Sequence, residues 1–478
     1  MATSDLAGFV VRRERERAGL SQAALARRAS ISASYLNQIE HNRRALTPHV
    51  QLRLAEVLGI EAQALSADEQ ARTAAALVDL FAAQPELTRP STSDLRAVAD
   101  QMPDVADAML RLGATRRRDL GRIEALESRL GDQRGPVASV MPYESVRDYF
   151  AHHRNYFDEL DRDAEALADE LGLVPRQRYD QLSRHLHSLG VDVLERPRSL
   201  VKGQRRFDPD GRTLLIADEL RPDQKAFQAA SQIALLRVSG LIDDLVTDEL
   251  MESPVTRRLA RIGLANYFAG ALVLPYADFL AAAQRVRYDI DLLSQRCEVS
   301  FETICHRLST LQRPDSRGVP FALVRVDRAG NISKRQSATP FHFSQSGGTC
   351  PLWTVYDSFS RPDELLRQVA EMPDGRAYLW VARTVTSTVG GFRAPNKTFA
   401  VGLGCDLAYA SELVYSDGLD LDDPRARTPI GMGCRVCERP ACPQRAFPFA
   451  GRELQVDENR AQLFPYVHEP EPRDPYAG

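Results

Sequence analysis

Three cysteines near the C-terminal end of the chain have the spacing of metal ligands. They form a C-x2-C-x4-C pattern preceded by two glycines that let the backbone turn, and they are Cys434, Cys437 and Cys442. A four-ligand site needs one more ligand, for which we expect Cys405, with Cys350 as the alternative. The spacing alone does not separate structural zinc from an iron–sulfur cluster, so both metals remain open.

The other cysteines support this interpretation. The chain has seven cysteines, and the first twenty residues carry arginines where a signal segment would be apolar. This pattern does not fit a secreted protein held together by disulfides. Cys297 and Cys305 fall on apolar helical patterns and are expected in the core.

A second group of polar residues lies near the N-terminus, where the pattern predicts short helices over Leu6–Ala18, Ser21–Ala29 and Ala33–Glu40. An ordinary helical hairpin is the alternative to a helix-turn-helix whose last helix enters the major groove of DNA. Gln22 is expected to bind a phosphate, and Arg43 to supply charge along the DNA backbone. The candidates for base edges and sugar-phosphate are Ser32, Ser34, Tyr35, Asn37 and Gln38.

The charge distribution favours the DNA-binding alternative. The whole chain has a formal net charge of −4, but residues 1–65 hold nine arginines and six acidic residues, which makes this segment +3 and the remainder −7. A basic N-terminal segment with outward polar side chains is typical of a DNA-binding domain.

The stretch 176–275 is predicted to contain strands at Val191–Glu195 and Thr213–Ala217 and helices at Asp223–Val238 and Leu264–Pro275. The last helix resembles one in ImmA/IrrE-type metallopeptidase domains. Such a peptidase needs two histidines four residues apart, with a glutamate beside the first. The matching positions hold Ser231, Gln232 and Leu235, and no glutamate lies just before Asn266 as a third ligand. We therefore expect a pocket that is kept for binding and has no peptidase activity.

A basic segment, 196–206, lies between the two predicted strands and contains five cations. Such a segment suits a phosphorylated ligand such as a nucleotide or coenzyme A. The expected contacts are Lys202, Arg205 and Arg206, with Tyr267 stacking on a base. The alternative is a solvated basic loop and a core role for Tyr267.

The length of 478 residues predicts two to four domains, and 44% hydrophobic with 26% charged residues is ordinary globular usage. The expected fold class is multidomain: an all-α helix-turn-helix domain, a mostly α peptidase-like domain, and an α+β C-terminal domain with strands near Pro320–Val326, Tyr378–Val385 and Lys397–Gly402. The expected ranges are 1–65 for the first domain, 66–142 for a helical linker or oligomerisation arm, 143–317 for the degenerate peptidase-like domain, 318–465 for the cysteine-bearing sensor domain and 466–478 for a disordered tail. Since no apolar run is long enough to span a membrane, we expect a cytoplasmic protein.

The segments 301–313, 347–353 and 433–439 resemble the short-chain fatty acyl-CoA regulator family, and the first 65 residues resemble Cro/repressor-like helix-turn-helix regulators. The first resemblance extends over essentially the whole chain. It implies a transcription factor for propionyl-CoA and methylcitrate, or acetate and glyoxylate, metabolism, with an acyl-CoA ligand and a 4Fe-4S cluster. The second implies a homodimer, or a higher homo-oligomer, that reads double-stranded operator DNA.

Two alternatives remain at this point. One is a DNA-binding redox sensor that needs no acyl ligand. The other is an enzyme, either a residual metallopeptidase or an acyl-CoA-processing protein. The residues at 231–235 count against the first enzyme, and no nucleophile–base pair is visible for the second. We therefore expect no enzymatic activity.

Overall fold

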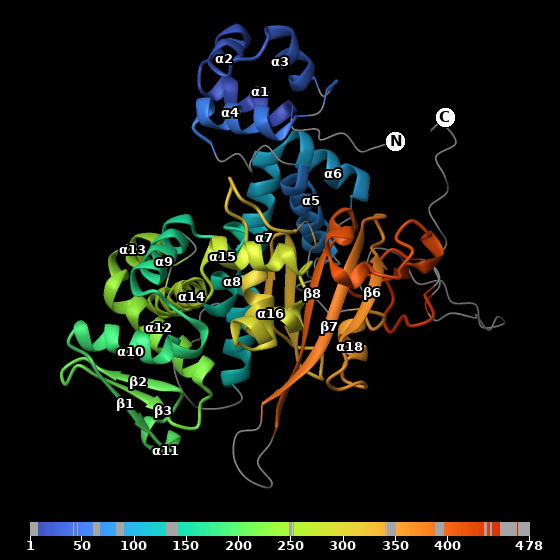
Figure 1. Cartoon of the computed structure of the whole chain (residues 1–478). Helices are drawn as coiled ribbons and strands as arrows, with labels where there is room; N and C mark the ends of the chain where they lie inside the picture. The colour runs from blue at the N-terminus through green and yellow to red at the C-terminus, as the bar shows by residue number, and fades with distance from the viewer. Residues whose placement is uncertain are drawn as a thin grey trace, which may run out of the picture. The chain divides into compact units, whose positions relative to one another are not determined.

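The structure is a computed structural model that describes residues 8–41, 43–44, 46–60, 67–82, 90–130, 142–247, 251, 253–339, 341, 350–387, 396–434, 437–439, 442–449 and 466 (Figure 1). The chain divides into two compact units. Unit 1 comprises Met1–Glu127, Pro340–Cys350 and Gly431–Gly478, and unit 2 comprises Ser128–Thr339 and Pro351–Ile430.

Unit 1 begins with four short helices, α1 (Gly8–Arg17), α2 (Gln22–Arg28), α3 (Ala33–Glu40) and α4 (Pro48–Leu58). The Oγ atoms of Ser21 and Ser32 accept hydrogen bonds from backbone N–H groups and cap α2 and α3. Leu25, Leu36 and Leu54 are fully buried between the helices. The predicted helix-turn-helix is thereby confirmed, and α3 has the predicted bounds.

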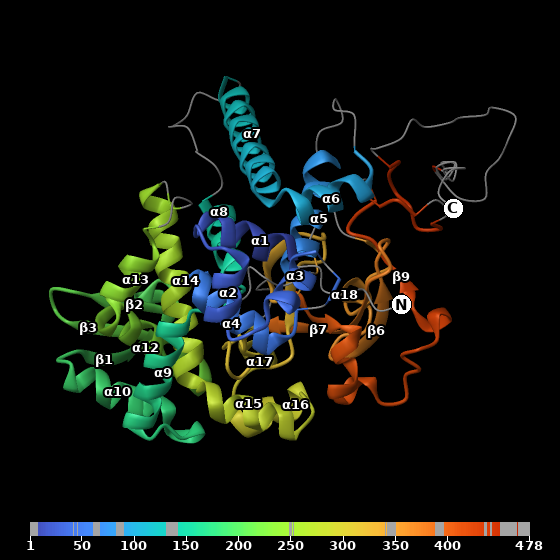
Figure 2. The same ribbon diagram turned by 90° about the horizontal axis from the view of Figure 1, so that it is seen from above.

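Three further helices follow in the same unit: α5 (Ala67–Ala82), α6 (Thr92–Gln101) and α7 (Pro103–Leu130). They share a small apolar core that includes Leu77, Leu80 and Leu95. Gly113 permits this packing, because a Cβ there would overlap the Leu80 side chain. Figure 2 shows α7 as one long helix.

Unit 2 contains a helical part with a small sheet. Its helices are α8 (Pro142–His152), α9 (Asp158–Leu171), α10 (Arg178–Ser188), α11 (Arg198–Val201), α12 (Pro222–Arg237), α13 (Ser239–Leu245), α14 (Pro254–Val273), α15 (Tyr276–Arg285), α16 (Ile290–Cys297) and α17 (Phe301–Leu308). The strands β1 (Asp192–Arg196), β2 (Arg205–Asp208) and β3 (Thr213–Ala217) form a sheet in the order β1-β3-β2. The strand β1 is parallel to β3, and β2 is antiparallel to it.

The sequence pattern from Tyr143 to Gly172 reads as one helical stretch, but the structure has two helices there, α8 and α9. The break occurs at Arg154 and Asn155, whose φ angles of 48° and 58° are left-handed and incompatible with a continuing α-helix. Gly172, with φ of 55°, ends α9 as expected.

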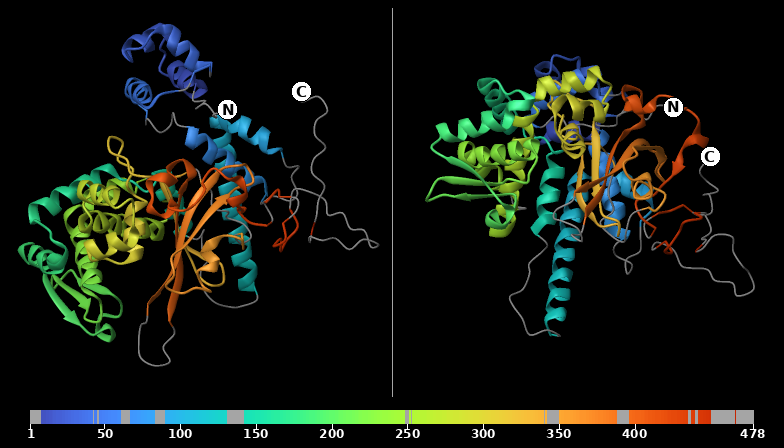
Figure 3. Two further views of the ribbon diagram at one scale, coloured as in Figure 1. Left: turned by 45° about the vertical axis from the view of Figure 1, so that its right-hand side comes forward. Right: turned by 60° about the horizontal axis from the view of Figure 1, so that its bottom comes forward.

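A second sheet in unit 2 has the order β5-β4-β8-β7-β6-β9. Its strands are β4 (Phe321–Val326), β5 (Ile332–Ser337), β6 (Leu366–Glu371), β7 (Ala377–Ser387), β8 (Lys397–Asp406) and β9 (Thr428–Pro429), and α18 (Thr354–Asp357) follows β5 in the chain. The two longest strands, β7 and β8, run antiparallel side by side (Figure 3). Gly404 on β8 allows Trp380 on β7 to lie flat against it, because a Cβ there would be 2.5 Å from the indole ring.

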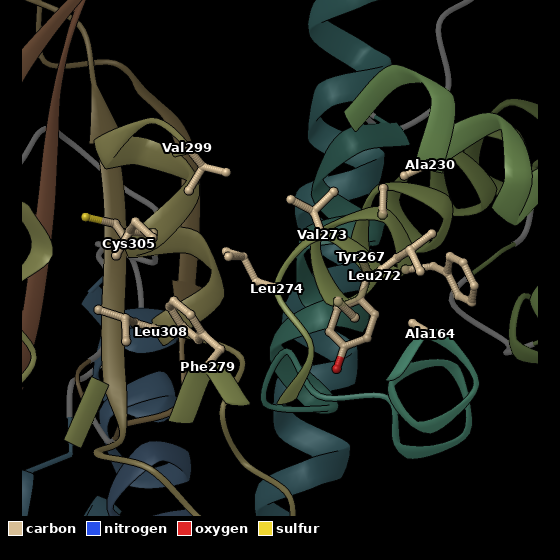
Figure 4. Close-up of a cluster of buried hydrophobic side chains, with 14 of the residues drawn as sticks. Ala164, Ala230, Tyr267, Leu272, Val273, Leu274, Phe279, Val299, Cys305 and Leu308 are labelled. Atoms are coloured by element: carbon tan, nitrogen blue, oxygen red, sulfur yellow. The ribbon is translucent and has the colours of Figure 1, made fainter. Parts of the chain in front are cut away.

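One apolar core joins the helices and the second sheet of unit 2. Figure 4 shows part of it, where Tyr267 and Leu272 of α14 lie near Ala164 of α9, while Leu308 of α17 lies near Phe279 of α15. The predicted fold class is therefore correct: the N-terminal and middle parts are mostly helical, and the C-terminal part combines helices with a sheet.

The structure divides the chain differently from the predicted ranges, because 143–317 and the sheet strands share one core. The cysteine segment after Gly431 belongs instead to unit 1. The predicted boundary segment 131–141 and all of the predicted tail except Tyr466 lie outside the described residues.

Candidate functional site

The surface of α2 and α3 is the candidate DNA interface. Ser34, Asn37 and Gln38 are exposed on α3, Ser32 is exposed at its N-terminus, and Arg43 is exposed just beyond its end. This is the outward polar face that the sequence predicts. Tyr35 is half-buried, and the Arg44 guanidinium lies 4.9 Å from its ring centroid. A helix with such a face can present its side chains to the edges of bases.

Gln22 is not a free phosphate ligand in this arrangement. Its Nε2 donates a hydrogen bond to Glu40 Oε2 at 2.9 Å. Arg15 donates to both Glu40 oxygens, at 2.6 and 3.1 Å, and the Glu40 side chain is only 1% exposed. The buried carboxylate of Glu40 therefore ties α1 and α2 to the end of α3. The sequence analysis missed this role, because a single Glu at the end of a helix carries no special pattern.

The candidate metal loop is organised around a buried arginine. Arg445 is 4% exposed, and its guanidinium donates hydrogen bonds to the carbonyl oxygens of Cys434, Cys437 and Arg439 at 2.7 to 2.9 Å. The Ala446 N–H group donates to Cys434 Sγ at 3.4 Å. A thiolate accepts such bonds, so the donor set fits a metal chemically. However, no three His, Cys, Asp or Glu side chains among the described residues lie close enough together to hold an ion.

Cys405 does not fit the predicted role of fourth ligand. It lies on β8 of unit 2, fully buried in the apolar core, between Phe321 and Leu379 of the neighbouring strands. Burial raises the pKa of its thiol, which disfavours the thiolate that a metal binds. Cys350 belongs to unit 1 together with the three loop cysteines. The alternative ligand Cys350 is therefore the better candidate.

The positions of the missing peptidase residues lie together on α12 and α14. Ser231 Oγ lies 3.2 Å from Asn266 Oδ1 and also donates to the Phe227 carbonyl at 2.9 Å. Gln232 is 3% exposed, and its Oε1 accepts a hydrogen bond from Arg205. Hydroxyl and amide groups satisfy one another where a peptidase needs imidazoles and a carboxylate.

A cavity of about 320 Å³ opens beside these residues, entirely within unit 2. Helices α12, α14 and α17 and strands β4 and β5 line it. Its polar lining includes Gln228, Asn266, Glu302, His306, Arg325 and Lys334. A second cavity, of about 400 Å³, shares Asp223, Val273 and Val299 with the first, and its walls include Arg176, Arg178 and Arg221. The two cavities are thus adjacent.

A buried ionic network forms one wall of the first cavity. The carboxylate of Asp161 is fully buried and accepts hydrogen bonds from Arg307 at 2.7 Å and from Arg313 at 3.3 Å. The Tyr267 hydroxyl donates to the same carboxylate at 2.7 Å and accepts a hydrogen bond from the Phe157 N–H group. Burial raises the pKa of Tyr267 well above its usual value. These contacts fix the positions of Arg307 and Tyr267.

The predicted ligand contacts do not form a single group. Tyr267 lines the first cavity, but its ring is held in the core by the contacts just described. Lys202 and Arg206 are exposed and line neither of these cavities. Arg205 points inward to Gln232, because side chains alternate along β2. Of the predicted set, the structure places only Tyr267 at the cavity.

The sequence analysis missed the charged residues of α17, β4 and β5 that line the cavity. On α17, His306 lies four residues after Glu302 and three after Thr303, and this helical spacing is a signal for a polar stripe facing the cavity. Arg325 and Lys334 face each other across paired strands, and only the register brings them together.

In the part of the chain that the structure describes, none of the individual helices combines the length and the apolar character that a membrane span requires. Helices α14 and α15 reach the length and apolarity of a membrane span only when they are taken together, and a bend of 63° separates them.

The fold and these sites define a multidomain helix-turn-helix protein with a degenerate peptidase-like domain. Family profiles match it in the same order: a helix-turn-helix domain at 7–68, an IrrE N-terminal-like domain at 186–309, and the C-terminal domain of the short-chain fatty acyl coenzyme A regulators at 310–466.

Characterised relatives match over nearly the whole chain. This chain is 46% identical over 461 residues to the HTH-type transcriptional regulator PrpR of Mycobacterium tuberculosis, and the match covers 96% of this chain and 95% of that regulator. It is 48% identical over 464 residues to RamB of the same organism, covering 96% and 98%. It is 39% identical over 466 residues to the propionyl-CoA carboxylase regulator of Cereibacter sphaeroides, covering 98% and 99%.

A solved structure of a Mycobacterium tuberculosis transcriptional regulator is also similar, with a TM-score of 0.67 and 52% identity over 69% of this chain and 100% of that one. This chain therefore belongs to the short-chain fatty acyl-CoA regulator family and is a DNA-binding transcriptional regulator.

Proposed function

We propose that this regulator controls short-chain acyl-CoA metabolism, of propionyl-CoA and methylcitrate or of acetate and glyoxylate, by binding an acyl-CoA in unit 2. The observation that carries the proposal is the cavity of about 320 Å³ beside Ser231 and Asn266. It has the size of a small-ligand site but lacks the residues of the peptidase. The relatives' names, including a propionyl-CoA carboxylase regulator, support this choice of ligand class.

The two adjacent cavities suit the two ends of an acyl-CoA. The second cavity is lined by Arg176, Arg178 and Arg221, and guanidinium groups bind phosphates well. The shared residues Val273 and Val299 are apolar and suit the chain between the phosphates and the thioester. In this arrangement the acyl group lies in the first cavity.

Acyl-CoA binding would regulate DNA binding by biasing a homodimer between two arrangements of its DNA-binding helices. The strength of this coupling is limited by the difference in acyl-CoA affinity between the two arrangements. Residues from helices and from the sheet both line the cavity, so a ligand there stabilises one packing of the two parts of unit 2.

A cysteine-ligated metal centre is part of the proposal, with a 4Fe-4S cluster preferred over zinc. Its ligands would be Cys434, Cys437 and Cys442, with Cys350 from the same unit as the fourth. A cluster supplies one-electron redox chemistry, whereas zinc supplies only a structural clasp. Arg445 supports either, because it holds the backbone of the loop in place.

A cavity-filling variant tests the acyl-CoA site. Gly270 lines the first cavity, and no atom lies within 4 Å of a Cβ built on it. Gly270→Phe should fill the cavity and abolish propionyl-CoA binding in calorimetry, while leaving the unfolding temperature close to that of the wild type. Gly240→Phe is the matched control, because Gly240 is equally open but exposed on α13. Undiminished binding by Gly270→Phe would place the ligand elsewhere.

A DNA-binding redox sensor without an acyl ligand is the second candidate. It is favoured by one observation, that the cysteine segment belongs to the unit that carries the DNA-binding helices. Thr92 Oγ1 at the start of α6 donates to Glu438 Oε1 at 2.8 Å, and Met432 packs against the core of α5 to α7. A change in the cysteine loop would thus reach α5, α6 and α7 directly, and these helices belong to the same unit as the DNA-binding helices α2 and α3. Titrating propionyl-CoA against the protein's affinity for a DNA site obtained by in vitro selection separates the two candidates.

A further inference from the structure

The charged groups that line the first cavity do not balance one another. Arg325 is paired with Glu302 at 2.7 Å, and Arg307 is paired with Asp161. Asp223, at the side shared with the second cavity, is paired with Arg221 at 3.1 Å. Each of these ionic groups therefore has an opposite charge within the protein.

Lys334 is the exception. Its ammonium group makes no hydrogen bond or ion pair with any residue that the structure describes, although Glu302 and Arg325 are its charged neighbours. Lys334 is half-buried, and an ammonium group that gives up part of its water without gaining a partner leaves the site receptive to an anion. His306, the other titratable group on this wall, stays neutral because burial and the surrounding cations lower its pKa.

The position of Lys334 also indicates which part of a ligand would reach it. Lys334, Arg325 and His306 line the first cavity but not the second, whose walls carry Arg176, Arg178 and Arg221. If the phosphates of coenzyme A lie against these arginines, Lys334 faces the acyl group.

We propose that Lys334 makes this cavity selective for acyl-CoA esters whose acyl chain ends in a carboxylate, over uncharged acyl chains of the same shape. The inference rests on the proposed function, since it assumes that an acyl-CoA occupies the cavity. The carboxylate forms a charge-assisted hydrogen bond with the Lys334 ammonium, and Lys334 lies opposite Arg325, which is paired with Glu302.

The selectivity should depend on pH. Burial lowers the pKa of Lys334 to about 8, so the ammonium form that binds a carboxylate is lost above this pH in the free protein. The affinity for a carboxyacyl-CoA therefore falls as the pH rises above about 8. The affinity for an uncharged acyl-CoA does not follow this titration.

The test compares malonyl-CoA with isovaleryl-CoA, whose acyl groups have the same shape but differ in charge. Calorimetry on the full chain, with propionyl-CoA and free CoA as further probes, should give malonyl-CoA an advantage of about ten- to hundredfold, the range for a hydrogen bond to a charged group. Lys334→Met should remove this advantage and Lys334→Arg should keep it. The matched control is Lys397→Met, because Lys397 is an exposed lysine at the start of β8 in the same unit.

The other outcomes overturn the inference in distinguishable ways. If the wild type prefers isovaleryl-CoA or binds both equally while propionyl-CoA still binds, the selectivity is absent but the proposed function stands. If Lys334→Met weakens binding of all four probes by one factor, Lys334 holds a phosphate of CoA and not an acyl carboxylate. If no probe binds the folded wild type, the proposed function fails as well.

Discussion

Ser231 on α12 and Asn266 on α14 are joined by a hydrogen bond of 3.2 Å at the place where a related peptidase would hold zinc. Because a hydroxyl and an amide are poor zinc ligands, this pair replaces a metal site with an internal polar contact. The first prediction is that the wild type, incubated with Zn²⁺ and casein, shows no hydrolysis. Hydrolysis that a chelator abolishes would contradict this interpretation of the pair.

The second prediction concerns the buried Asp161. Asp161→Ala leaves Arg307 and Arg313 without their shared carboxylate, and breaking a buried pair in this way costs about 3–5 kcal/mol. The free energy of unfolding in urea measures the loss. Asp417→Ala is the control, because its pair with Arg287 is about half exposed and its loss should change stability by at most about 1 kcal/mol. Equal effects of the two variants would contradict the network's structural role.

The third prediction tests the packing of β7 against β8. Gly404→Ala places a Cβ against the Trp380 ring, so strands or indole must shift, at a cost of about 1–3 kcal/mol. Gly240→Ala adds the same methyl group in open space on α13 and should be neutral or stabilise by up to about 1 kcal/mol. Thermal unfolding of both variants gives the comparison. An unchanged unfolding temperature for Gly404→Ala would contradict the tight packing of Trp380 against β8.

The fourth prediction separates two kinds of DNA contact. Asn37→Ala and Gln38→Ala remove exposed α3 side chains and should each reduce discrimination between a selected DNA site and its variants by about 1–3 kcal/mol. Arg43→Ala should instead weaken binding to all sequences and reduce the salt dependence. Fluorescence anisotropy at several salt concentrations measures both effects. A sequence-specific loss in Arg43→Ala, with none in Asn37→Ala, would reverse the assignment.

The fifth prediction concerns the cysteines. After anaerobic purification, the wild type should contain iron with acid-labile sulfide and a broad visible absorption; zinc alone would assign the loop a structural role. Cys437→Ser and Cys350→Ser should lose the metal. Cys405→Ser should retain it, because Cys405 lies in the core of unit 2. Full metal content in a folded Cys437→Ser protein would rule out the cysteine loop as the site.

The comparison of sequence and structure shows which features local patterns can predict. The bounds of α3 and β3 follow from hydrophobic periodicity and short polar turns, and both agree with the predicted ranges. The position of Lys334 opposite Arg325 depends on strand register, and the arginine partners of Asp161 lie about 150 positions further along the chain. The position of Cys405 could not be predicted for the same reason, since its spacing to the loop does not reveal that β8 is a central strand.

The most direct test of the central claim is the affinity of the wild-type protein for a selected DNA site, measured with and without saturating propionyl-CoA. If the acyl-CoA binds in the cavity and biases the DNA-binding arrangement, the dissociation constant for DNA should change by about 5- to 150-fold, the usual range for allosteric coupling. The change should be absent in Gly270→Phe. An unchanged dissociation constant in the wild type, under conditions where calorimetry shows propionyl-CoA bound, would contradict the account.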